Sequence, residues 1–202
     1  MSTGGHSNFF PHTLLRAHNW QHRPELDRVC DWWRGGGRGI CALVGMGGAG
    51  KTAIAERFLR ILPGGLPADP AVAKDASLPT PHSAFVFSFY DAPNPEAFFE
   101  ALQMWLEHTP RIETMLSVGQ MMFLLQQTPG LVVMDGLEKV QDEGLRGGAS
   151  GQINDGRLKD LVLRVADALL PISLLVTSRF RLYDPLAQRA DHYRQIEVEN
   201  LE

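Results

Sequence analysis

The sequence has few of the residues that are typical of secreted or metal-binding proteins. It contains only two cysteines in 202 residues, Cys30 and Cys41, and both lie in apolar surroundings without metal-type spacing. We interpret them as reduced, buried thiols rather than as a disulfide or a ligand pair. This cysteine usage favours a cytoplasmic protein.

Long apolar runs and an excess of positive charge are also missing. No stretch approaches the roughly 18 uncharged residues of a membrane span, and residues 1–12 lack the basic start and apolar centre of a signal peptide. Nineteen Lys and Arg against 23 Asp and Glu give a net charge of -4, whereas non-specific binding to nucleic acid requires excess positive charge. Neither a membrane nor a nucleic acid is therefore an expected partner.

The residues that are present favour one packed domain of the α/β class. Hydrophobic residues make up 44% of the chain, and five short apolar runs alternate with segments of helical period. Runs that are apolar throughout indicate strands covered on both faces, and their alternation with helices predicts a parallel sheet between two helical layers. The predicted strands are Ile40–Val44, Ala84–Phe89, Leu131–Met134, Ile172–Val176 and Gln195–Val198.

Helices are predicted before, between and after these strands. The first covers Pro24–Arg34, and a second follows the first strand and stops at Pro63. A third begins at Asn94, an N-cap candidate followed by proline. Two further helices are predicted over Ile112–Gln127 and Gly156–Leu170, the latter with Leu169 on its apolar face. Residues 1–36 are an N-terminal segment with one short helix, and residues 37–202 form the main body.

The strongest motif is a glycine-rich loop that fits the pattern G-x-x-x-x-G-K-[ST]. Glycines let backbone N–H groups approach a phosphate closely, and the helix that follows adds the positive end of its dipole. The lysine then reaches the β- and γ-phosphates and the threonine hydroxyl binds Mg²⁺. The alternative is a glycine-rich turn with an incidental lysine. The nucleotide-binding candidates are Gly45, Met46, Gly47, Gly48, Ala49, Gly50, Lys51, Thr52 and Ala53.

A second motif is the apolar run 131–134, which ends in Asp135. A strand that ends in a carboxylate has the form of a Walker B element, whose Asp helps to bind Mg²⁺; a turn residue is the alternative. Glu138 follows three residues later and is a candidate for the group that orients or deprotonates the attacking water. A solvated acidic residue beside Lys139 explains Glu138 about equally well.

A third motif is Thr177-Ser178-Arg179 at the end of the fourth predicted strand. The carboxyl ends of parallel strands face one ligand crevice, where an arginine can contact a γ-phosphate. Arg179 could instead cap the sheet edge or pair with Asp184. The aromatic run 85–90, which ends in Tyr90, is better explained by core packing than by base stacking.

Together these motifs, GMGGAGKTAIAERFL, LVVMDGLEKV and LLVTSRF in that order, resemble the STAND class of P-loop ATPases, which includes NB-ARC domains. The segment 22–26 resembles the short arginine motif that precedes the P-loop in that class, which implies that Arg23 helps to hold the adenine. The resemblance implies a three-layer P-loop NTPase with sheet order 5-1-4-3-2 and Arg179 beside the phosphates.

The same resemblance implies an ATP/ADP switch with Mg²⁺ as cofactor. The parent protein would be closed with ADP, would oligomerise with ATP, and would carry an effector and a C-terminal sensor beyond residue 202. The chain by itself is then expected to be monomeric. Gly136 replaces the usual second acidic residue after Asp135, and Arg23 lies one residue nearer to Glu25-Leu26 than is common.

Two other function classes stay open. One is a metabolic P-loop kinase, although no second-substrate site or arginine-rich lid is evident. The other is a nucleotide-binding interaction module that does not turn over ATP. The position of Glu138 relative to the γ-phosphate would separate the last alternative from a slow ATPase.

Overall fold

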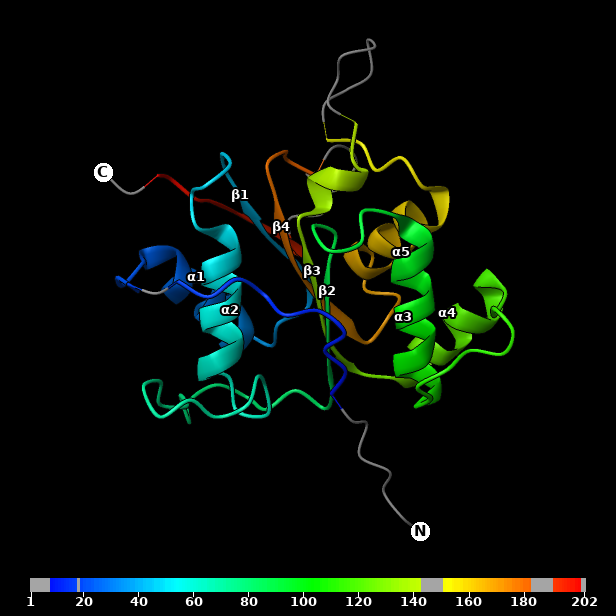
Figure 1. Cartoon of the computed structure of the whole chain (residues 1–202), viewed down its shortest axis with the longest axis horizontal. Coiled ribbons are helices and arrows are strands. Elements are labelled where there is room, and N and C mark those ends of the chain that lie inside the picture. Colours follow the sequence, from blue (N-terminus) through cyan, green and yellow to red (C-terminus); the bar gives the residue numbers. More distant parts are fainter. Residues whose placement is uncertain (1–7, 18, 143–150, 183–190, 201–202) are drawn as a thin grey trace.

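A computed structural model describes residues 8–17, 19–142, 151–182 and 191–200 of the chain. Asp184 and the glycine-rich stretch 143–150 therefore lie outside the described residues. A five-stranded, fully parallel sheet stands at the centre with the order β2-β3-β4-β1-β5 (Figure 1). Read from the other edge, this is the predicted order 5-1-4-3-2.

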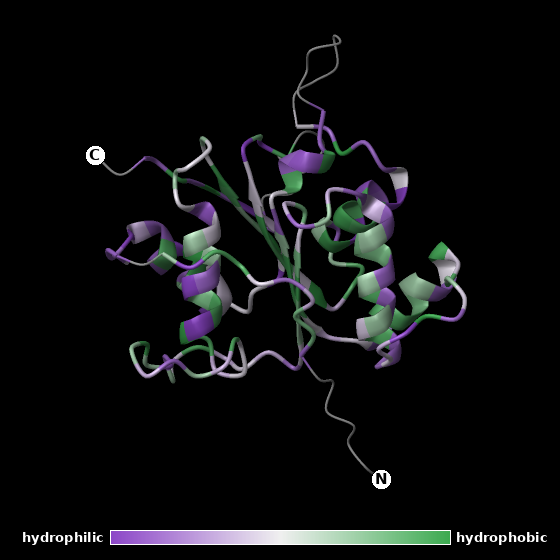
Figure 2. Cartoon of the chain, in the orientation of Figure 1, coloured by the Kyte–Doolittle hydropathy of each residue, from purple (hydrophilic) through white to green (hydrophobic). Residues whose placement is uncertain are grey.

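All five predicted strands are present, with small shifts at their ends. The first four runs are buried at every position, which explains why they are mostly apolar (Figure 2). The last strand, β5, is one of the two edge strands and has mixed burial. The strands are β1 Gly39–Val44, β2 Ala84–Ser88, β3 Gly130–Asp135, β4 Ile172–Ser178 and β5 Tyr193–Glu197.

Helices cover both faces of the sheet (Figure 1). Helices α1 (Pro24–Arg34) and α2 (Lys51–Ile61) pack on one face, and α3 (Pro95–Glu107), α4 (Val118–Gln127) and α5 (Gly156–Ala166) on the other. Alternate strand residues supply the two cores. The predicted three-layer arrangement is therefore confirmed.

Two helix predictions were wrong at their ends. Helix α4 starts six residues after Ile112, because Ser117 accepts a hydrogen bond from the Gln120 amide and forms a capping box with that residue. Helix α5 stops at Ala166 instead of Leu170, and Ala168 has a left-handed φ of 54°. Leu169 is consequently exposed rather than packed on the apolar face.

Other local predictions were confirmed. The Asn94 side chain caps α3 by accepting from the Ala97 amide at 2.7 Å. Both cysteines are free and buried, and burial raises the pKa of the Cys41 thiol to about 12. In the part of the chain that is described, no helix is long and apolar enough to cross a membrane.

The N-terminal segment is packed onto the core. Phe9 forms a parallel bridge with Phe85, so that residues 8–12 run along the outer edge of β2. Further along the segment, Arg23 reaches the loop after β1. The segment therefore contacts both the β2 edge and the site described next.

Candidate functional site

The predicted site residues converge at the end of the sheet that is formed by the carboxyl ends of its strands (upper side in Figure 1). The loop 45–50 joins β1 to α2, and Asp135 and Ser178 are the last residues of β3 and β4. A parallel sheet with this order brings these positions together, because β4 lies between β1 and β3.

The loop 45–50 has the backbone of a phosphate cradle. Gly48 and Gly50 have φ angles of 84° and 91°, a region that side chains disfavour, and Gly50 is the N-cap of α2. The N-terminus of an 11-residue helix thus opens directly onto the loop. Glycine is required here by conformation.

Lys51 folds back onto this loop. Its Nζ donates to the carbonyl oxygens of Gly45 and Met46 at 2.7 and 2.8 Å. Burial and the nearby Arg179 lower the pKa of Lys51, while the carboxylates of Glu138 and Asp135 oppose that shift. The ammonium group is thus held within the cradle that an anion would enter.

Asp135 is the centre of a hydroxyl cluster. It is 1% exposed, and its Oδ1 accepts from Thr52 Oγ1 and Thr177 Oγ1, both at 2.7 Å. Ser88 Oγ donates to Oδ2 at 3.3 Å. Burial raises the pKa of Asp135, and the three hydroxyl donors counteract part of that shift. Sequence reasoning missed the parts played by Ser88 and Thr177, although both are strand-end residues.

These oxygens fit a magnesium site. A carboxylate and a hydroxyl are hard ligands of the kind that Mg²⁺ prefers, and Thr52 and Asp135 lie in hydrogen-bond contact at the end of the phosphate cradle. These two residues would hold the ion, which would supply positive charge to the phosphates of a bound nucleotide.

Glu138 is buried, which argues against a merely solvated acidic residue. It lies in the short 3-10 helix Leu137–Val140, is 8% exposed, and its Oε1 accepts from the Tyr90 hydroxyl at 2.5 Å. The other oxygen, Oε2, is buried and has no hydrogen-bond partner among the described residues. Burial and the bond to Glu138 raise the pKa of Tyr90. Core packing is thus correct for Phe85, Phe87 and Phe89 but wrong for Tyr90, which is 43% exposed.

Arg179 lies over the phosphate loop. A Cβ built on Gly47 would come within 2.9 Å of Arg179 Nη2, so the guanidinium sits against that glycine. Its Nε is 3.6 Å from Glu138 Oε1, and the side chain is 55% exposed. The arginine therefore lies near both the loop and the acid.

Arg23 joins three parts of the chain beside the loop. Its guanidinium forms two hydrogen bonds with the Glu25 carboxylate, donates to Ala49 O at 3.2 Å and donates to Glu199 O at 2.7 Å. The pairing with Arg23 lowers the pKa of Glu25. Arg23 thus connects the start of α1, the phosphate loop and the segment after β5.

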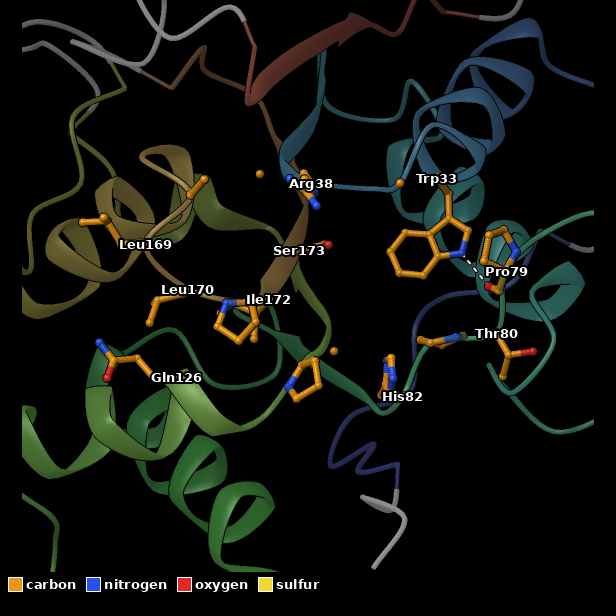
Figure 3. Close-up of a pocket in the computed structure, with 17 residues that line it drawn as sticks. Trp33, Arg38, Pro79, Thr80, His82, Gln126, Leu169, Leu170, Ile172 and Ser173 are labelled. Carbon is orange, nitrogen blue, oxygen red and sulfur yellow. Dashed lines mark hydrogen bonds between the residues drawn. The ribbon is translucent and has the colours of Figure 1, made fainter. Parts of the chain in front are cut away.

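A separate cavity lies elsewhere in the fold. It measures about 650 Å³ and opens at the amino ends of β1, β3 and β4, between Trp33, Arg38, His82 and Leu170 (Figure 3). Trp33 Nε1 donates to Pro79 O at 2.7 Å in its wall. The cavity lies at the amino ends of the strands, whereas the glycine loop lies at their carboxyl ends. It is therefore not the phosphate site.

Comparisons with known proteins give low-identity similarities in structure only. No family model matches the chain, and no curated protein matches it. A STAND protein with a tetratricopeptide repeat sensor from Pyrococcus horikoshii is 14% identical with a TM-score of 0.47; the match covers 93% of this chain and 24% of that one. The ORC2 protein of Aeropyrum pernix is 13% identical with a TM-score of 0.41, over 87% of this chain and 47% of that one. The chain thus spans about a quarter and about half of their lengths.

Proposed function

We propose that the chain is an ATP- and ADP-binding regulatory module of a STAND signalling ATPase, related to NB-ARC domains. It would act as a nucleotide-dependent switch with slow hydrolysis of ATP. The observation that carries the proposal is the convergence of Lys51, Thr52 and Asp135. The Lys51 ammonium donates to the glycine loop, and the hydroxyl of Thr52, the next residue, donates to the Asp135 carboxylate, although Asp135 is 83 positions away from Thr52.

Each residue then has a task that its position suits. Lys51 exchanges its bonds to the loop carbonyls for bonds to the β- and γ-phosphates, so that the loop is ready to receive an anion. Thr52 and Asp135 hold the metal. Arg179, which lies against Gly47, reads the γ-phosphate and so distinguishes ATP from ADP. Arg23 supports the adenine side of the loop.

One observation favours a variant of this function without turnover. Gly136 stands where the second acid usually follows the Walker B aspartate, and Tyr90 packs against it so closely that a Cβ would come within 2.6 Å of the tyrosine ring. A side chain at position 136 would therefore require the tyrosine ring to shift. Hydrolysis therefore depends on Glu138, and without its participation the chain would bind nucleotide and not cleave it.

Further domains would complete the switch. We expect the parent protein to carry an effector and a C-terminal sensor, and to oligomerise with ATP bound. Arg23 donates both to Ala49 O in the phosphate loop and to Glu199 O after β5. These two hydrogen bonds would transmit a change in the phosphate loop to the segment that follows β5.

The test is the binding of nucleotide to the purified chain. Denaturing the protein and identifying the released nucleotide by chromatography shows whether ADP is retained, and calorimetry gives the affinities for ADP and ATP with and without Mg²⁺. Lys51→Ala removes the cation of the loop and should weaken both nucleotides at least about tenfold, or roughly 1.4 kcal/mol. Lys159→Ala removes a lysine on α5 that has no role at the site, and it serves as the matched control. Unchanged affinity in a folded Lys51→Ala protein would contradict the P-loop function.

A further inference from the structure

Tyr90 is a polar residue at the site that the proposed function leaves without a task. It lies two residues after the end of β2, and β2 pairs with β3, so its ring reaches the turn that leaves Asp135. The ring packs on Gly136, which has a left-handed φ of 74°, and the Lys139 ammonium lies 5.4 Å from the ring centre. The contacts with Gly136 and Lys139 thus help to fix where the phenol points.

The hydroxyl of Tyr90 determines how Glu138 is oriented. It donates to Oε1 at 2.5 Å, and Arg179 Nε lies 3.6 Å from the same oxygen. With Oε1 held in this way, Oε2 is left buried and without a partner. A carboxylate oxygen in that condition is costly unless a further group donates a hydrogen bond to it.

We infer that Tyr90 is a positioning residue that engages one oxygen of Glu138 and so reserves the other, Oε2, for the water that attacks ATP. The inference rests on the proposed function. In that step the water oxygen forms a bond to the γ-phosphorus, and the bond from that phosphorus to the bridging oxygen breaks, with its electron pair leaving on ADP. The water proton passes to Oε2 of Glu138 and then to the released phosphate.

This arrangement also accounts for the missing second acid. The Tyr90 ring occupies the space that a side chain at position 136 would need, and the same ring carries the hydroxyl that orients an acid three residues further on. Gly136 therefore leaves space for the Tyr90 ring, and the Tyr90 hydroxyl in turn orients Glu138.

The kinetic test uses Tyr90→Phe, which keeps the ring and removes only the hydroxyl. We expect kcat for ATP hydrolysis to fall by about tenfold or more with KM unchanged, because the lost contact orients a base rather than binding nucleotide. Tyr193→Phe, which removes the hydroxyl that donates to Gln195 on β5, should leave both constants unchanged. Glu138→Gln should lower kcat by roughly 10²-fold or more.

The double variant separates positioning from general damage. If Tyr90 acts through Glu138, Tyr90→Phe should cost nothing further in a Glu138→Gln background, whereas a merely structural effect would multiply the loss. Calorimetry with ADP, run on every variant, reports on the proposed function separately. Hydrolysis by Tyr90→Phe at the parent rate, with ADP binding intact, overturns the inference and leaves the nucleotide-binding function standing. A parent chain that binds ATP and never hydrolyses it overturns both the inference and the hydrolytic part of the switch.

A second readout needs no turnover. In proton NMR of the ligand-free chain, a hydroxyl in a short bond to a buried carboxylate should give a far-downfield resonance that exchanges slowly with water. That resonance should disappear in Tyr90→Phe, change in Glu138→Gln and persist in Tyr193→Phe. Its absence from the parent protein would overturn the contact, even if Tyr90→Phe did not fold.

Discussion

At the scale of single residues, the site concentrates buried ionisable groups. Lys51, Asp135 and Glu138 are all less than a tenth exposed, at the end of a sheet whose strands are mostly apolar. Buried charges cost free energy unless partners compensate for them. Three buried charged residues at the carboxyl ends of the strands are consistent with a binding site for a charged ligand. Their burial also implies a measurable loss of stability.

Asp135→Asn should stabilise the ligand-free protein at neutral pH. Burial raises the folded-state pKa of Asp135 above its unfolded value, so the folded form binds that proton more tightly and the charged carboxylate destabilises the fold. Thermal unfolding temperatures should therefore be higher for the variant at neutral pH. As the pH falls through the raised pKa, the parent loses this penalty and the difference should vanish.

The same substitution should weaken Mg-ATP more than metal-free ATP, because the lost interaction runs through the ion. Asn keeps an oxygen that can accept from Thr52 and Thr177, so the hydroxyl cluster should persist. In the thermal unfolding experiment, an Asp135→Asn protein that is less stable than the parent at neutral pH would show that hydrogen bonding to the carboxylate outweighs its desolvation.

Arg179→Ala should lower the affinity for ATP relative to ADP by about tenfold, roughly 1.4 kcal/mol, because only ATP offers the terminal phosphate. Calorimetry with the two nucleotides measures the ratio. Arg181→Ala is a matched control, since Arg181 pairs with Glu197 at 2.8 Å on the exposed side of β5. Equal losses of ATP and ADP affinity would assign Arg179 a structural role.

At the scale of elements, helix ends are fixed by single polar side chains. Ser117 and Asn94 each accept a hydrogen bond from an amide in the first turn of their helix. Such caps contribute about 0.5–2 kcal/mol each. They decide where α3 and α4 begin, and they limit where the chain between the helices can run.

Ser117→Ala should lower the free energy of unfolding by about 1 kcal/mol, because the Gln120 amide loses its acceptor and the capping box is broken. Urea denaturation followed by circular dichroism measures the change. An unchanged midpoint would mean that packing of α4, and not its cap, fixes the start of the helix.

The parts of the fold that were predicted from sequence are those that one contiguous segment encodes. The glycine loop, the four buried strands and helices α1 and α3 each carry their own pattern of residues. Asp135 and Arg179 could be placed at the site because both follow directly on a buried strand. The start of α4 was missed because apolar residues continue on its N-terminal side, and only the cap at Ser117 marks the boundary.

Contacts between elements could not be predicted in this way. Tyr90 was assigned to the core along with the phenylalanines before it, since the sequence does not show that the turn after β3 brings Glu138 to its hydroxyl. The hydrogen bonds of Ser88 and Thr177 to Asp135 depend on β2 and β4 both lying beside β3. The strand order was predicted from the family resemblance. The hydrogen bonds to Asp135 become evident only in the three-dimensional structure.

At the scale of the whole molecule, both edges of the sheet are protected against pairing with another sheet. On one side, residues 8–12 cover β2, where Phe9 exchanges backbone hydrogen bonds with Ala84 and Val86. On the other side, β5 carries polar residues, including Arg194 and Glu197. Charged or covered edges are the usual means by which sheets avoid association.

The described surface is therefore expected to leave the 202-residue chain monomeric, with or without ATP. Its exposed large apolar side chains are few, and those that share a region, Met115, Val118 and Phe123, lie on α4 and the turn before it. Stable interfaces bury about 800 Å² per partner and concentrate apolar residues at their centre. Light scattering of the ligand-free, ADP-loaded and Mg-ATP-loaded protein should give one mass near 22.4 kDa in all three states. An oligomer formed only with Mg-ATP would show that this core carries its own assembly surface, and Phe123→Ser would then test whether α4 forms it.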